Sequence, residues 1–218
     1  MTFEDRIDAG RQLGARLRHV VGDEQLVVVG LPRGGVPVAA EVAVALDAPL
    51  DVIGVRKLGV PTHPELAMGA IGEGDARWLD DDIVRRARVT DDELEVVERR
   101  ERAELERRLR RFREHQEPRD LNGTTVIVVD DGIATGATAR AACRVARSHG
   151  AARVVLATPV APRGWAARLA GVADEFVAVS TPAGFRAVGQ YYRDFGQTGE
   201  DEVIEYLRAA AARTIEPS

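Results

Sequence analysis

The amino-acid sequence predicts an α/β fold, in which a parallel β-sheet is covered by helices on both faces. Short, continuous apolar runs rich in valine, such as 26–31 and 125–129, are typical of strands buried on both sides. Segments of helical character separate these runs, and buried strands that alternate with helices form parallel sheets. The chain has 218 residues, 45% hydrophobic and 30% charged, which is enough material for one large domain with a single core.

The elements can be placed in order along the chain. Apolar residues recur at helical spacing over 2–21, which predicts an amphipathic helix. A strand at 26–31 and an apolar helix over about 36–46 follow, and a second strand is predicted at 50–55. The remaining strands are predicted at 125–129, 154–158 and 176–179, with alanine-rich helical segments between them.

Two regions interrupt this alternation. Residues 57–75 contain two prolines and several glycines, a composition that predicts a long functional loop rather than an ordinary connection. Residues 90–93, Thr-Asp-Asp-Glu, form a capping box that predicts a helix running to about residue 116. One apolar stripe follows this helix, made of Leu94, Val97, Leu105, Leu109 and Phe112.

This long helix is rich in charge. Eight arginines and four glutamates lie between residues 99 and 114. A solvated arm that packs along the domain or against a second subunit explains this composition, and a surface for RNA or another anionic partner is the alternative. Base stacking needs interleaved aromatic side chains, which the segment does not supply, so the packed arm is favoured.

The segment 126–140, VIVVDDGIATGATAR, predicts a phosphate-binding site. A buried strand ends in two acids, Asp130 and Asp131, and a loop of small residues leads into a helix over 139–149. Small residues let backbone N–H groups approach a ligand, hydroxyl groups of Thr135 and Thr138 add donors, and a helix N-terminus favours an anion. The acids cannot bind the phosphate, so we expect them to face a neighbouring polyol or metal. A ribose 5-phosphate fits this pattern.

Two further segments carry features of an anion site. Gly34 and Gly35 follow the first strand, where they allow close backbone approach, although such a turn is often only a turn. Arg56 and Lys57 end the predicted second strand, at the edge of a parallel sheet where ligands bind. An exposed basic pair without a function is the alternative for these two residues.

Taken together, these segments resemble the type I phosphoribosyltransferases. The carrying motif is VIVVDDGIATGAT, which is similar to the signature with which that family binds phosphoribosyl pyrophosphate (PRPP). The resemblance implies a parallel-sheet core at about 22–57 and 120–180, a lid and helical insertion at 57–119, and a small hood from residues 1–21 and 180–218. All of these belong to a single domain, 1–218.

The resemblance also implies roles for individual residues. Asp130 and Asp131 would bind the ribose hydroxyls and hold Mg²⁺ indirectly, through the ribose or water. Arg56 and Lys57 would stabilise the departing pyrophosphate, and His63 in the lid would assist it. The PRPP-binding set would be Arg33, Gly34, Gly35, Gly132, Ala134, Thr135, Gly136, Ala137 and Thr138. The hood would bind a base through Phe185, Val188 and Tyr191.

We therefore expect a Mg²⁺-dependent enzyme that moves the 5-phosphoribosyl group from PRPP to a nitrogen acceptor, with a nucleobase as the expected acceptor. Hypoxanthine-guanine enzymes carry a further acid at the position of Ala134, so a 6-oxopurine is disfavoured and the acceptor stays unassigned. A regulatory protein that senses PRPP or a nucleotide without turnover is the alternative.

Composition bounds the remaining expectations. The net charge of −5 argues against nucleic acid as a partner, and the single cysteine excludes an intramolecular disulfide. No segment has the roughly 18–20 apolar residues of a membrane span, and no secretory signal is evident. We expect a cytoplasmic protein without a membrane partner, and the long exposed helix predicts a homodimer.

Overall fold

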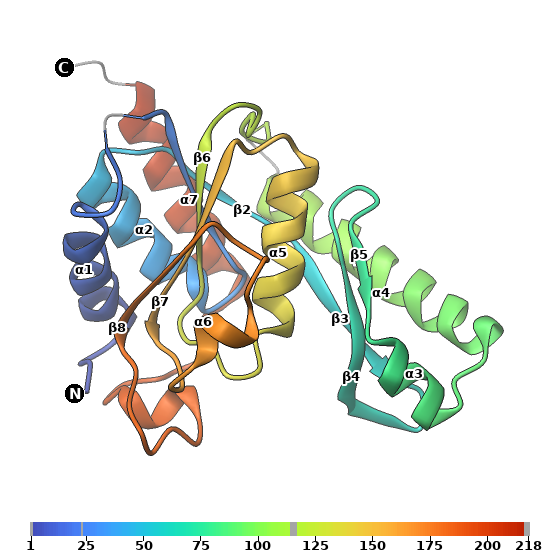
Figure 1. Cartoon of the computed structure of the whole chain (residues 1–218). Helices are drawn as coiled ribbons and strands as arrows, with labels where there is room; N and C mark the ends of the chain where they lie inside the picture. The colour runs from blue at the N-terminus through green and yellow to red at the C-terminus, as the bar shows by residue number, and fades with distance from the viewer. Residues whose placement is uncertain (1, 23, 114–116, 216–218) are drawn as a thin grey trace.

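A five-stranded parallel sheet forms the centre of the molecule (Figure 1), as the sequence predicts. The structure, a computed structural model, describes residues 2–22, 24–113 and 117–215. The strand order is β2-β1-β6-β7-β8, and every neighbouring pair is parallel. The strands are β1 (Leu26–Gly30), β2 (Leu50–Val52), β6 (Thr125–Val129), β7 (Arg153–Val160) and β8 (Glu175–Ser180).

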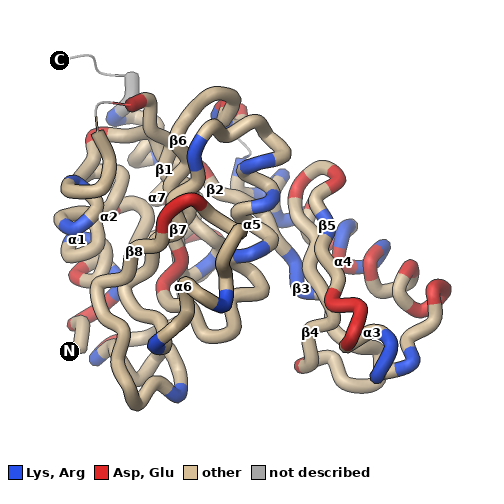
Figure 2. The backbone as a smooth tube through the Cα atoms, in the orientation of Figure 1, with Lys and Arg blue, Asp and Glu red and all other residues tan. Residues whose placement is uncertain are grey.

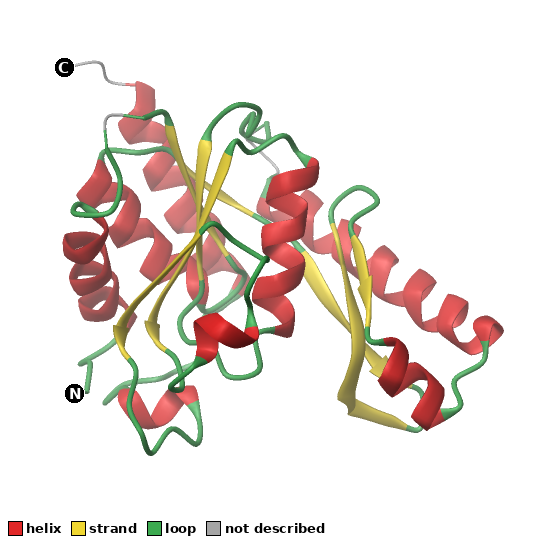
Figure 3. Ribbon diagram, in the orientation of Figure 1, coloured by secondary structure: helices red, strands yellow, loops and turns green. Residues whose placement is uncertain are grey.

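Helices cover both faces of this sheet (Figure 3). One face packs against α1 (Arg6–Leu17), α2 (Gly35–Leu46) and α7 (Glu200–Ile215), and the other against α5 (Ala137–Ser148) and α6 (Trp165–Arg168). Successive strand residues point to opposite faces, so Ile127 joins the first core and Val126 the second. Both faces of each strand are therefore apolar, which explains the continuous valine-rich runs.

A second, antiparallel sheet extends from this core (Figure 1, right). It consists of β3 (Val55–Val60), β4 (His63–Gly72) and β5 (Arg77–Leu79), and it is followed by α3 (Asp81–Ala87) and α4 (Asp91–Phe112). Two predictions are wrong here. Residues 57–75 form a hairpin rather than a long loop, and the strand predicted at 50–55 ends at Val52 before the chain enters the second sheet. The elements β5 and α3 were not predicted.

The glycines of the hairpin have a packing role. A Cβ atom at Gly59 would lie 2.4 Å from the carbonyl oxygen of Pro64, and one at Gly69 would lie 2.3 Å from that of Trp78. Glycine is thus required where neighbouring strands approach most closely, including the irregular register around Leu58–Gly59. Glycine usually disfavours a strand, but at these positions it allows the strands to pair.

The long helix packs along its own domain. Its first turn carries the predicted capping box, in which the Thr90 side chain and Glu93 each bond the other's backbone N–H. Leu94 and Val97 pack against the hairpin, and Phe112 joins the main core. The helix ends at Phe112, and residues 114–116 of its predicted end lie outside the described residues.

One arginine joins the inserted sheet to the core. Arg113, directly after α4, forms ion pairs with Asp51 of β2 at 3.4 Å and with Glu73 at 2.6 Å. It also donates to the carbonyl oxygen of Val52 at 2.7 Å. All three side chains are at least 85% buried, so the insertion is fixed at its base by a buried charge network.

The N-terminal segment meets residues 191–194 beside the carboxyl ends of the strands. Phe3 pairs with Tyr192, and its backbone N–H donates to the carbonyl oxygen of Tyr191 at 2.8 Å. Helix α7 lies farther along and covers the main sheet. Among the described residues, no helix is both long and apolar enough to cross a membrane.

Candidate active site

The candidate site lies where the strand order changes direction. From β1 the chain moves first to β2 on one side, and later to β6 on the other. In open parallel sheets, ligands bind beyond the carboxyl ends of the strands at such a point. The loops that follow β1 and β6 therefore share this position, and both are among the segments that the sequence singled out.

These two loops are in direct contact. The N–H of Leu31 donates to the carbonyl oxygen of Val129 at 2.9 Å. A Cβ atom at Gly34 would lie 2.1 Å from Oδ2 of Asp131, and one at Gly35 would lie 2.7 Å from the Val129 oxygen. Both glycines are thus needed for close approach. The peptide bond between Pro32 and Arg33 is cis.

The two acids at the end of β6 are half-buried and adjacent. Burial raises the pKa of Asp130, and the neighbouring charge of Asp131 raises it further. Burial also raises the pKa of Asp131, an effect that Arg6 opposes. A pair of carboxylates in this environment favours a further cation or a set of hydroxyl donors.

Arg6 is the site residue that sequence analysis missed. Its Nε atom donates to Oδ2 of Asp131 at 2.8 Å, and its guanidinium also donates to the carbonyl oxygen of Gly196 at 2.7 Å. The guanidinium stacks over the Phe195 ring, 4.0 Å from its centroid. Because Arg6 and Asp131 are 125 positions apart, and the chain has many arginines, no local pattern marks this pair.

The predicted phosphate loop connects β6 to α5. The helix begins at Ala137, two residues earlier than expected, so Ala137 and Thr138 form its first turn. Gly136 caps the helix with a φ of 84°, a left-handed conformation that favours glycine. Ala134 and Thr135 are exposed. The backbone N–H groups of this loop thus lie at a helix N-terminus, as an anion site requires.

The hood residues pack beside this loop. A Cβ atom at Gly132 would lie 2.2 Å from Cγ1 of Val188, so the hood rests directly on the loop. Phe185 stacks on Tyr191 with 5.6 Å between ring centroids, and Tyr191 is buried. The hydroxyl of Tyr192 donates to the backbone oxygen of Asp131 at 2.5 Å. The aromatic residues thus support the acids, and base binding by Phe185, Val188 and Tyr191 stays a prediction.

The predicted basic pair lies in the inserted sheet. Arg56 and Lys57 are in β3, where Arg56 pairs with Glu101 of α4 at 2.5 Å. Lys57 lies 3.8 Å from the Glu65 carboxylate and is 42% exposed. His63 begins β4 near the exposed end of the hairpin. Arg56 also lines a small cavity with Pro32 of the loop after β1. The roles of all three residues stay predictions.

The donor set also indicates how a metal would be held. No group of three or more His, Cys, Asp or Glu side chains suited to a metal occurs in the described part of the chain. The half-buried pair Asp130 and Asp131 supplies oxygen atoms and negative charge, which suits Mg²⁺ when most of its other ligands are water or substrate oxygens.

Comparison with known families agrees with this geometry. The model of the phosphoribosyl transferase domain matches residues 4–176, which include both loops of the site. The chain belongs to this family. The α/β architecture with a central parallel sheet is the fold class that the sequence predicted.

Individual relatives support this membership in the phosphoribosyl transferase family. Two Mycobacterium tuberculosis proteins, from strains CDC 1551 and H37Rv, are each named "putative phosphoribosyl transferase" and are 57% identical over 208 residues. The match covers 95% of this chain and 47% of each relative, so the chain spans about half the length of these curated relatives. The crystal structure of the protein TT1426 from Thermus thermophilus is 44% identical, with a TM-score of 0.82, covering 95% of this chain and 98% of that one.

Proposed function

We propose that this domain transfers the 5-phosphoribosyl group from PRPP to a nitrogen acceptor and releases pyrophosphate. The observation that carries this proposal is the contact between the loop after β1 and the acids after β6, where Gly34 approaches Asp131 without room for a Cβ atom. One loop suits a pyrophosphate, the next suits a 5-phosphate, and the acids between them suit a ribose. PRPP has the matching arrangement, with a ribose between a pyrophosphate and a 5-phosphate.

Each part of the site has a chemical role in this proposal. Asp130 and Asp131 accept hydrogen bonds from the ribose hydroxyls and orient the ring. The loop at 134–138 anchors the 5-phosphate through backbone N–H groups. The bond between C1 of the ribose and the pyrophosphate oxygen then breaks, and its electron pair leaves with pyrophosphate. The acceptor nitrogen bonds to C1 through its lone pair, and a proton carried by that nitrogen passes to pyrophosphate or to water. Catalysis in this scheme comes from positioning and electrostatics.

Charge neutralisation completes the proposed mechanism. Mg²⁺, when bound with the substrate, would offset the charge of pyrophosphate beside Asp130 and Asp131. Arg33 precedes Gly34 in the loop after β1, which contacts Asp131, and it would supply a positive charge beside the pyrophosphate. Arg56 and Lys57 would contribute if their ion pairs opened, since Arg56 is paired with Glu101 of α4 and Lys57 with Glu65 of β4.

The proposal is tested by removing the charge of both acids. We expect the Asp130→Asn/Asp131→Asn variant to lose Mg-PRPP binding in calorimetry, because amides donate where the ribose hydroxyls must also donate and cannot favour the cation. A Kd unchanged from that of the wild type would overturn the assignment. The exposed acid Asp75 provides the control, and Asp75→Asn should bind Mg-PRPP normally.

The regulatory alternative predicts a different result in the same system. Pyrophosphate release from Mg-PRPP, measured across a panel of nitrogen acceptors, distinguishes the two. Tight binding of Mg-PRPP without release for any acceptor would contradict the transferase and support a sensor of PRPP.

A further inference from the structure

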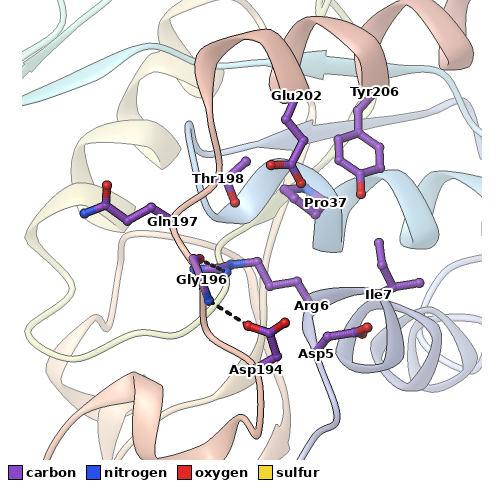
Figure 4. A pocket seen from close by; sticks show the side chains of 10 residues that line it. All are labelled: Asp5, Arg6, Ile7, Pro37, Asp194, Gly196, Gln197, Thr198, Glu202 and Tyr206. Carbon is purple, nitrogen blue, oxygen red and sulfur yellow. Dashed lines mark hydrogen bonds between the residues drawn. The ribbon is translucent and has the colours of Figure 1, made fainter.

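A cavity of about 220 Å³ lies beside the acids, and the mechanism above does not use it. It is formed by the start of α1, the first turn of α2, the loop at 194–198 and the first turns of α7 (Figure 4). Arg6 lines it, and the same guanidinium contacts Asp131. One side chain thus separates the cavity from the proposed ribose site, so a ligand in the cavity would lie next to that site.

Carboxylates dominate the polar lining. Glu202 points into the cavity from α7, while Asp5 and Asp194 approach from the opposite side (Figure 4). Arg6 is the one basic residue among the described residues of the lining, and it is already bonded to Asp131. The lining therefore carries an excess of negative charge.

These carboxylates retain capacity for a ligand. Asp5 accepts one backbone N–H at 2.8 Å, Asp194 accepts that of Gly196 at 3.0 Å, and Glu202 accepts that of Gly199 at 3.3 Å. Two carboxylate oxygens offer about four acceptor positions in total, so each group can bind further N–H donors. The helix N-termini of α1 and α7 offset part of the negative charge but do not use these positions.

Thr198 is a second, independent indication of a ligand. The residue is only 5% exposed and lines the cavity, and its hydroxyl points into it (Figure 4). Within the described residues this hydroxyl has no hydrogen-bond partner. Every fully enclosed side-chain polar atom in the same residues does have a partner, so the Thr198 hydroxyl must be open to the cavity. The cavity is therefore where the hydroxyl meets a partner, either water or a ligand.

The pKa of Tyr206, which lines the same cavity, indicates the sign of the charge around it. Burial raises the pKa of its phenol, and the carboxylates of Glu202, Glu41 and Asp5 raise it further, as does Glu205. The phenol is thus stabilised in its neutral form by negative charge around it. A cation in the cavity would experience the same charges as attraction.

We propose that this cavity binds a small cationic group with several N–H donors, of the amidinium or ammonium class, and that the acceptor substrate carries this group. The second part rests on the proposed transferase function, and the first part does not. The attacking nitrogen is a different atom of the acceptor, since a nucleophile must keep a free electron pair. Arg6, between the cavity and Asp131, would orient the acceptor relative to the ribose.

Binding is tested with methylguanidinium as the probe and methylurea as a neutral compound of the same shape. Both are titrated into the ¹⁵N-labelled chain, and the backbone amide signals of residues 196–198 are followed by NMR. Saturable shifts are expected with methylguanidinium and not with methylurea. Equal effects of both compounds, or no saturable shift at about 50 mM, would overturn the proposal.

Variants locate the probe. Glu202→Gln should raise the Kd for methylguanidinium about fivefold, which is the effect of losing one exposed charge interaction. Asp75→Asn is the control, because Asp75 is an exposed acid that neither lines the cavity nor acts on Tyr206, and it should bind as the wild type does. An unchanged Kd in Glu202→Gln would overturn the assignment of the cavity.

The acceptor assignment has its own readout. In pyrophosphate release from Mg-PRPP, Glu202→Gln should raise KM for amidinium- or ammonium-bearing acceptors about fivefold more than KM for neutral ones. If methylguanidinium binds but both classes of acceptor change alike, the cavity is an effector site and the acceptor assignment is overturned. If Mg-PRPP itself fails to bind while methylguanidinium binds, the transferase proposal fails and the cation site remains.

Discussion

At the level of single residues, the ionised carboxylates of Asp130 and Asp131 are expected to lower the free energy of unfolding. Burial raises the pKa of both carboxyl groups, so their charged forms are disfavoured in the folded protein. Arg6 contributes a nearby positive charge, and it contacts Asp131. A substrate that brings hydroxyl donors and a metal ion would stabilise the charged carboxylates. Part of its binding free energy would therefore come from relieving the unfavourable ionisation of the free site.

This cost predicts a dependence on pH. Because the pKa of Asp130 is higher in the folded than in the unfolded chain, its ionisation destabilises the fold as pH rises, and the effect is absent below the ordinary aspartate pKa of about 3.9. Asp130→Asn cannot ionise. We expect it to raise Tm by a few degrees at pH 7 and by nothing near pH 3, in thermal unfolding followed by circular dichroism. Asp75→Asn should change Tm little at either pH, and an equal gain for both variants would contradict the explanation.

Gly34 provides a second prediction for a single residue. Gly34→Ala would place a methyl group 2.1 Å from the present position of Asp131 Oδ2, so the carboxylate must move away from Arg6. The φ of −64° is acceptable to alanine, and the fold should therefore be retained.

We expect Gly34→Ala to raise the Kd for Mg-PRPP about tenfold or more in calorimetry, while its Tm stays within a few degrees of the wild type. Gly184→Ala is the matched control, because nothing lies within 4 Å of a Cβ atom there. Wild-type affinity in Gly34→Ala would show that the position of Asp131 is unimportant for binding.

At the level of elements, the inserted sheet is where sequence patterns were least informative. Prolines and glycines in 57–75 predicted a loop, yet the segment forms most of β3 and β4. The reason is tertiary: Leu58 and Met68 are buried against α4, and the glycines admit close strand contacts. Local propensity cannot anticipate a packing partner such as α4, which begins only at Asp91, well beyond the hairpin.

Arg113 is predicted to hold this insertion in place. Arg113→Met would leave Asp51 and Glu73 buried without their cation, which costs about 3–5 kcal/mol for comparable buried pairs. Urea denaturation measures the loss. Arg110→Met is the control, since Arg110 is exposed on the same helix and its removal should cost less than about 0.5 kcal/mol.

A companion variant keeps the Arg113 prediction testable if the single change prevents folding. Arg113→Met/Glu73→Gln removes one of the two unpaired charges and should recover part of the lost stability. Equal stability of Arg113→Met and Arg110→Met would contradict the role of the network.

At the level of the whole molecule, the arginine-rich helix is explained by contacts within one chain. Its apolar stripe packs on the inserted sheet and the core. Its arginines alternate with acids (Figure 2), and several pair with Glu104, Glu200 or Asp201. The packed arm along the domain is thus the interpretation that the structure supports. The homodimer predicted from the exposed helix stays a prediction, which light scattering can test.

The sequence by itself determined the site segments that are continuous in the chain. Residues 126–138 encode a buried strand, two acids, a loop and a helix start, and each feature follows from residues within a few positions. Tertiary structure alone decided the contacts between distant segments. Arg6 meets Asp131 because α1 packs beside the sheet, and the proposed cation cavity combines four segments from both ends of the chain. Such contacts depend on the packing of layers, which no local pattern specifies.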